Sequence, residues 1–182
     1  MGEYKYRSVR AWLFGLGRLI SAAAMVCSTT ALALSSDEIR RDFPVESGQL
    51  LEVEADDADV YITAHEGADV RVEIVRTAQA VDEATEQRML ERHTVDINQK
   101  DGRVRIKSRL RPQLQTSKLH IRQFNVRINV LVPWRFDTDL KTADGNVHVE
   151  GVDGHLRAHT SDGDIGLKDV QGDLRVDTSD GD

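Results

Sequence analysis

Apolar and polar residues alternate through much of the chain after residue 50, which is the pattern of half-buried β-strands. In four stretches every second residue is apolar: Leu51–Ala55, Val60–Ala64, Val70–Ile74 and Phe124–Val132. Such alternation places one set of side chains on a buried face and the other set toward solvent. The sequence therefore predicts a mainly β protein.

A helix and a β-hairpin are predicted between these strands. Residues 79–93 contain good helix formers and neither glycine nor proline, with apolar residues at roughly helical spacing, so we predict one helix there. Val95–Ile97 and Val104–Ile106 flank the turn dipeptide Asp101-Gly102, which favours tight turns. We predict that these two stretches form the arms of a hairpin.

The last part of the chain repeats a nine-residue pattern. The repeat is marked by glycine at every ninth position: Gly145, Gly154, Gly163, Gly172 and Gly181. Apolar residues follow the first four glycines at the second and fourth positions, as in a short strand. Alternate nine-residue repeats differ in their last residues, so the full period is eighteen residues. This period brings Thr142, Thr160 and Thr178 into equivalent positions.

Repeats of this length cannot bury their apolar face alone, so neighbouring repeats must stack. We interpret residues 142–182 as a β-solenoid of 18-residue coils that follows an N-terminal β-rich region, residues 34–141. A meander of hairpins gives the same nine-residue spacing, and the spacing does not separate the two. The chain stops at Asp182, as a new repeat begins, so we expect a truncated product or a partner subunit over the open end.

Residues 1–33 have the features of a secretory signal peptide. Four basic residues precede an apolar run, and Ala31–Ala33 has the small-x-small form of a cleavage site. The run Leu19–Leu34 has 16 residues, short for a membrane-spanning helix. We predict export to the periplasm, outer envelope or cell surface with cleavage after Ala33, and an uncleaved membrane anchor is the alternative.

Cysteine content and charge exclude two classes of function. Cys27, the only cysteine, lies in the signal peptide, so the mature chain has no disulfide and no cysteine-ligated metal. The signal peptide holds four basic residues and Glu3, so its removal changes the net charge from −7 to −10. Because so acidic a protein repels phosphate groups, we expect no nucleic-acid binding.

Charge is distributed unevenly along the chain. Residues 100–127 hold nine basic residues and one acidic residue, whereas residues 142–182 hold ten acidic and three basic residues. The outward positions of the second hairpin arm are all basic: Arg103, Arg105, Lys107 and Arg109. These four form a candidate electrostatic contact for an envelope polymer, a glycan or the acidic repeat of another protein subunit. A solvated strand face is the alternative.

The aspartates of the repeat are candidate calcium ligands. Asp144, Asp162 and Asp180 recur every eighteen residues, and Asp164 lies two places after Asp162. Stacked coils would set such oxygens about 4.8 Å apart, and calcium is bound by about six to eight oxygens. Aspartate before glycine is also what tight turns favour, so solvated turn residues are the default interpretation. No other cofactor is expected.

No serine, histidine and acid are arranged as a nucleophilic catalytic motif. Outward-facing acidic residues occur in every repeat in the same way, whereas an active site would interrupt the regular pattern of the repeats. We therefore expect that this protein is not an enzyme. A carbohydrate-active β-helix, with acids and bases on an exposed sheet, is the less favoured alternative.

One strand and three segments of the repeat carry a family resemblance. They are Val126–Pro133, Lys141–Val147, Thr160–Asp164 and Thr178–Asp182. Together they resemble the putative adhesin family of exported bacterial β-strand-repeat proteins (domain of unknown function 4097), over Phe43 to the end. The resemblance implies a cell-envelope β-solenoid with a binding or structural role, an unknown ligand and no catalytic residues. An envelope sensing or scaffold role without adhesion is the near alternative.

Overall fold

The computed structural model describes residues 35–111 and 121–181. The predicted signal peptide, residues 1–33, lies outside the described residues, so its cleavage and the membrane-anchor alternative stay predictions. The described part is mainly β, with twelve strands and one helix, and its strands form two six-stranded sheets. Neither sheet closes on itself across these residues. No helix in the described ranges is long and apolar enough to cross a membrane.

The first sheet, sheet A, mixes antiparallel and parallel pairing. In order across the sheet, its strands are β1 (Ser35–Pro44), β4 (Asp69–Ala80), β7 (Ile121–Pro133), β3 (Asp59–His65), β9 (Val147–Glu150) and β11 (Ile165–Lys168). β4 is antiparallel to β1 and to β7. From β7 onward every neighbouring pair is parallel.

The second sheet, sheet B, is parallel except at one edge. In order, its strands are β12 (Leu174–Thr178), β10 (Leu156–Asp162), β8 (Asp137–Asp144), β2 (Leu50–Asp57), β6 (Arg103–Leu110) and β5 (His93–Lys100). The antiparallel pair is β5 with β6, which confirms the predicted hairpin. Asp101 and Gly102 form its turn, with φ of 51° and 71°.

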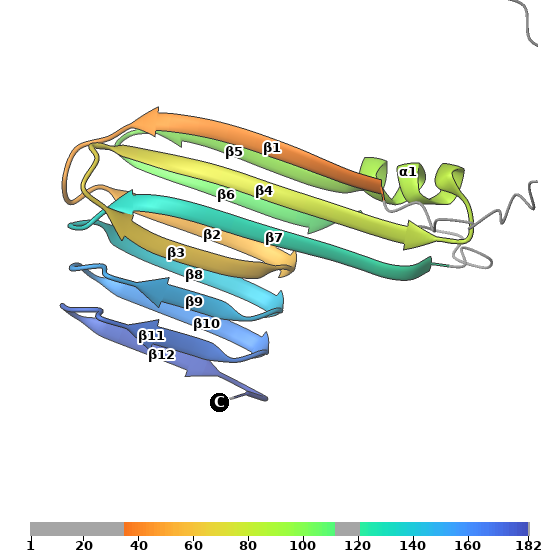
Figure 1. Ribbon diagram of the computed structural model, residues 1–182. Helices are drawn as coiled ribbons and strands as arrows, with labels where there is room; N and C mark the ends of the chain where they lie inside the picture. The colour runs from red at the N-terminus through yellow and green to blue at the C-terminus, as the bar shows by residue number, and fades with distance from the viewer. Residues whose placement is uncertain (1–34, 112–120, 182) are drawn as a thin grey trace, which may run out of the picture. The chain divides into compact units, whose positions relative to one another are not determined.

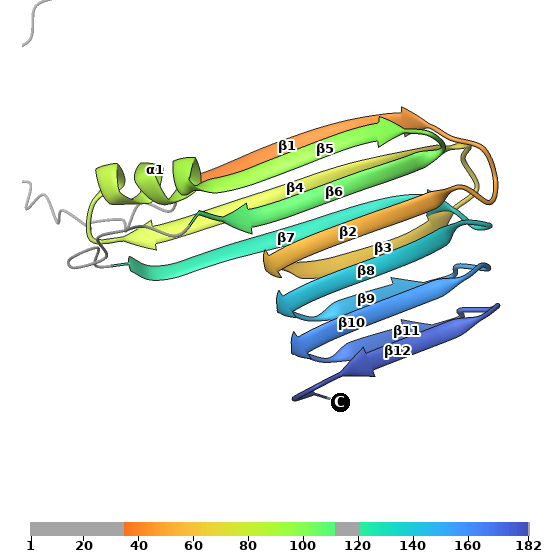
Figure 2. The ribbon, with the colours of Figure 1, turned by 180° about the vertical axis from the view of Figure 1, so that it is seen from behind.

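The two sheets lie face to face, as both views of the ribbon show (Figures 1 and 2). The alternating apolar residues of both sheets point into one shared core. Phe136, Leu51, Ile62, Ile74 and Leu156 are among its fully buried side chains, with at most 1% of their surface exposed. The predicted inward face of each early strand is therefore confirmed, and burial of these side chains supplies most of the favourable free energy of folding.

The end of the chain alternates between the sheets, from β8 in sheet B to β9 in sheet A and onward to β12. Residues eighteen positions apart are paired, for example Leu156 with Leu174 and Val147 with Ile165. This pairing is parallel, whereas a meander of hairpins is antiparallel, so the structure excludes the meander. β2 and β3, from much earlier in the chain, lie between β6–β7 and β8–β9.

The corners between the sheets pack so closely that only glycine fits at several of them. Gly145 has φ of 146°, and a Cβ at this position would overlap the carbonyl oxygen of Ala58 in the coil beneath. A Cβ at Gly163 would likewise overlap the carbonyl oxygen of Gly145. The glycine at every ninth position therefore does more than allow the chain to turn. Because it has no side chain, successive corners can stack at the distance that separates neighbouring strands.

The helix is present, but the predicted bounds of residues 79–93 are wrong at both ends. α1 spans Glu83–Arg92 and begins after Asp82, whose side chain accepts a hydrogen bond of 2.8 Å from the backbone N–H of Thr85. Ala80 still belongs to β4, and its N–H donates to the Glu86 carboxylate at 3.1 Å. His93 already belongs to β5.

We expect Gly145→Ala to destabilise the fold more than Gly48→Ala. Both glycines have positive φ, but a Cβ at Gly48 would meet nothing within 4 Å. The strained backbone alone costs about 1–3 kcal/mol, and at Gly145 the overlap with Ala58 adds to this cost. Urea unfolding of the two variants measures the difference, and equal losses would show that the corners do not pack this closely.

Candidate functional site

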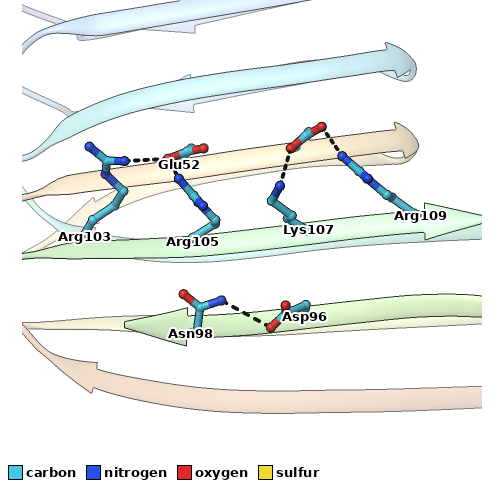
Figure 3. Close-up of polar contacts among 8 residues, drawn as sticks. Glu52, Asp96, Asn98, Arg103, Arg105, Lys107 and Arg109 are labelled. Atoms are coloured by element: carbon cyan, nitrogen blue, oxygen red, sulfur yellow. Dashed lines mark hydrogen bonds and ion pairs between the residues drawn. The ribbon is translucent and has the colours of Figure 1, made fainter. Parts of the chain in front are cut away.

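The four predicted basic residues form a row on the outward face of β6, which we call the basic strip. Figure 3 shows their side chains reaching across to two glutamates of β2. Glu52 accepts from Arg105 at 2.9 Å and from Arg103 at 3.3 Å. Glu54 pairs with Lys107 at 3.1 Å and also accepts a hydrogen bond from Arg109.

Parallel pairing explains why these partners meet. β2 lies beside β6 in register, so Glu52 stands opposite Arg105 and Glu54 opposite Lys107. Hydrogen bonds from Lys107 and Arg109 lower the pKa of Glu54 below its ordinary value. Exposed ion pairs of this kind contribute only about 0–1 kcal/mol each to stability.

The basic strip is only partly neutralised. It has two positive charges for each glutamate it contacts, and the side chains of Arg103 and Arg109, at its two ends, are 47% and 51% exposed. On its other side lies β5, where Asp96 and Asn98 make a hydrogen bond to each other (Figure 3). The strip therefore presents solvent-accessible guanidinium groups that can contact an anion.

Further along sheet B, histidines face aspartates between coils. His155 lies 3.1 Å from Asp173, and His159 lies 3.3 Å from Asp177. Each pair joins residues eighteen positions apart: His159 and Asp177 are opposite partners on β10 and β12, and His155 and Asp173 directly precede these strands. This part of the face is exposed and balanced in charge, which separates it from the basic strip.

The predicted calcium ligands fall into two different places. Asp144 and Asp162 are directly opposite each other on β8 and β10, and Asp180 follows on the next coil close enough for its charge to act on Asp162. Asp164 lies beyond this corner, where its backbone N–H donates to Asn146 at 2.9 Å. Among the described residues, no group of three or more His, Cys, Asp or Glu side chains is placed to hold a metal ion.

The aspartate row instead shows mutual repulsion. Hydrogen bonding to Asp144, together with burial and the charges of Asp144 and Asp180, raises the pKa of Asp162. A fourth carboxyl, Asp57 of β2, stands opposite Asp144. Burial first, and then hydrogen bonding to Asp144, raises the pKa of Asp57.

Comparison with known proteins places this geometry in a family. The family model of Toastrack DUF4097 matches residues 87–182, just over half of the chain. The chain belongs to this family. No curated protein sequence matches it.

Solved structures resemble this chain at low sequence identity. The crystal structure of a putative cell adhesion protein from Clostridium sporogenes ATCC 15579 has a TM-score of 0.51 and 10% identity, covering 79% of this chain and 68% of that one. A putative adhesin from Bacteroides fragilis NCTC 9343 has a TM-score of 0.42 and 11% identity, covering 80% of this chain. This chain spans 60% of that adhesin, less than two thirds of its length. At such identity the first likeness shows a shared fold and nothing of function.

Sequence reasoning missed Asp57 as a member of the aspartate row of this Toastrack chain. The signal was present, because Asp57-Ala58-Asp59-Val60 has the aspartate and valine of Asp144-Gly145-Asn146-Val147, with Ala58 in place of the glycine and Asp59 in place of Asn146. Ala58 occupies the position where the later repeats have glycine, so the nine-residue spacing of glycines does not reveal this coil. Asp59 completes the likeness, since its carboxylate accepts from the backbone N–H of Asn146 at 3.1 Å.

We expect Asp144→Asn to raise the melting temperature at pH 7 by a few degrees, because it removes the charge between Asp57 and Asp162. A carboxyl with a raised pKa in the folded state favours folding at low pH and loses this contribution as pH rises through that pKa. The gain should therefore shrink toward about pH 4. Thermal unfolding followed by circular dichroism at several pH values measures it.

Asp177→Asn is the matched control for this prediction. It removes one negative charge from the chain, but Asp177 faces His159 and no carboxylate opposes it in the register. We expect no gain in melting temperature from this variant. An equal gain in both variants would attribute the effect to net charge and would contradict repulsion within the row.

Proposed function

We propose that this chain is an exported cell-envelope protein of the putative-adhesin type, without catalytic activity, that binds an anionic partner through the basic strip. The observation that carries the proposal is the excess of positive charge on β6, where four basic side chains share two glutamates. The chain as a whole has a net charge of −7, so the strip is a positive site on an acidic protein, suited to an anionic polymer, glycan or protein surface.

We also infer that the C-terminal repeat is a β-solenoid of 18-residue coils. The parallel pairing of β8 with β10 and β12, and of β9 with β11, supports this arrangement. In a solenoid each coil contacts only its neighbours, which gives a stiff support for a binding face. The solved structure with a TM-score of 0.51 is named a putative cell adhesion protein, and this name is consistent with a binding role.

The last strands support a second kind of contact, self-association. Leu174 and Val176 of β12 are 47% and 43% exposed, although the equivalent residues of β10, Leu156 and Ala158, are buried. Edge strands with exposed apolar residues pair readily with other chains. We propose that another subunit contacts this end of the sheets.

The double variant Arg103→Gln/Arg109→Gln tests the binding proposal. These two residues are the exposed ends of the strip, and their loss leaves Arg105 with Glu52 and Lys107 with Glu54, so the fold should persist. We expect the unmodified protein to bind immobilised dextran sulfate but not uncharged dextran. The variant should bind about tenfold more weakly, and rising salt should weaken both.

Arg157→Gln/Arg175→Gln is the charge-matched control, since it removes two basic residues from the same face of sheet B on β10 and β12. We expect this control to bind dextran sulfate like the unmodified protein. An equal loss in both double variants would show that net charge alone governs binding. That result, or the absence of binding at low salt, would contradict the proposed role of the strip.

A further inference from the structure

β7 is much longer than its neighbour β3, so part of its edge is open. β4 pairs with β7 along its whole length, down to Ala80 with Ile121, but β3 pairs with it only from Arg127 onward. Figure 1 shows β7 continuing past the end of β3 toward α1. Within the described ranges, Ile121–Val126 therefore has a paired strand on one side only. About half of its backbone N–H and C=O groups point to the open side.

A hollow of about 590 Å³ lies beside this open edge. Asn125 and Arg127 of β7 line it, together with Val75 and Thr77 of β4. Phe124 also lines it and is only partly buried, although it packs against the apolar cluster beneath α1. The hollow thus offers both unpaired backbone and apolar surface, which are the two things that an added strand requires.

The end of the hollow is acidic. It is formed by the corner residues Asp57, Asp59 and Asp144, where β2 turns into β3 and where β8 ends. Among the described residues no ion pair reaches Asp57 or Asp144, whose side chains face each other. A cation placed here would relieve the repulsion between them, so the corner is complementary to a basic group.

We propose that the open edge Ile121–Val126 of β7 is a docking site for an extended basic peptide, which adds to sheet A as an extra strand. Its backbone pairs with β7, its apolar side chains cover Phe124, and its basic side chain meets Asp57 and Asp144. This surface is separate from the basic strip, because it lies on the edge of the other sheet and attracts the opposite charge.

Other free edges of the sheets suit a peptide less well. β11 and β12, at the end of the repeat, have only four and five residues. β1 carries Arg40, Arg41 and Asp42 and ends at Pro44, and charged residues and proline protect an edge from pairing. Ile121–Val126 of β7 contains no proline and one charged residue, Arg122, so it is less protected than β1.

Binding of a fluorescein-labelled peptide of alternating valine and lysine, six residues long, tests this proposal on the full chain. We expect fluorescence anisotropy to show binding, and hydrogen exchange to show protection of the Gln123–Val126 amides by about tenfold. The same peptide N-methylated at every residue keeps its charge but has no backbone N–H to donate to the carbonyl groups of β7. We expect this peptide not to bind.

Two protein variants separate the acidic corner from net charge. Asp57→Asn/Asp144→Asn should weaken binding of the lysine peptide about fivefold. Asp173→Asn/Asp177→Asn, which removes two exposed aspartates, one directly before β12 and one within it, should leave binding unchanged. Equal binding of the N-methylated peptide, protection confined to β1 or β12, or equal effects of the two double variants would each overturn the proposal.

Discussion

Parallel pairing in register, at an interval of eighteen residues, is the constraint on which the rest of this structure depends. It places each residue of a coil directly beside its counterpart in the next coil, as in the pairs Leu156 with Leu174 and Asp144 with Asp162. Apolar residues thereby form continuous rows in the core. A carboxylate must either face a residue that can pair with it in the next coil, as Asp177 faces His159, or repel another carboxylate, as within the aspartate row.

The same constraint governs the two surfaces that carry the proposals. The basic strip is held because β2 lies in register beside β6, which places a glutamate opposite each inner cation. The open edge of β7 exists because β3 begins only at the Asp57–Asp59 corner, beside Arg127, whereas β7 begins at Ile121. The basic strip is thus a sheet face on which the pairing orders the side chains. The open edge of β7 is where the pairing between neighbouring strands stops.

The sequence predicted those parts of the fold that depend on local pattern. Alternation identified the early strands, Asp101-Gly102 identified the hairpin turn, and the eighteen-residue period identified which residues of the repeat are paired. The basic strip was also predicted as a row of outward side chains. These features follow from residues that are close in sequence or equivalent in a repeat.

The remaining features depend on contacts that no local pattern reveals. Glu52 lies about fifty residues before the basic strip, and its role required knowing that β2 is inserted beside β6. That coil was hidden because Ala58 replaces the glycine of the repeat. The helix bounds were wrong for a similar reason, since Ala80 pairs with Ile121 on a distant strand and its N–H bonds to Glu86, so it stays in β4.

Disulfide cross-linking measures the register directly. In a Cys27→Ser background, we expect His159→Cys/Asp177→Cys to oxidise readily, because the two residues are opposite partners and parallel strands lie about 4.8 Å apart. His159→Cys/Arg175→Cys, two residues out of register, should stay reduced under the same mild oxidant. Mass spectrometry of thiol-blocked protein distinguishes the two states. Oxidation of the out-of-register pair in preference to the opposite pair would contradict the pairing on which this account depends.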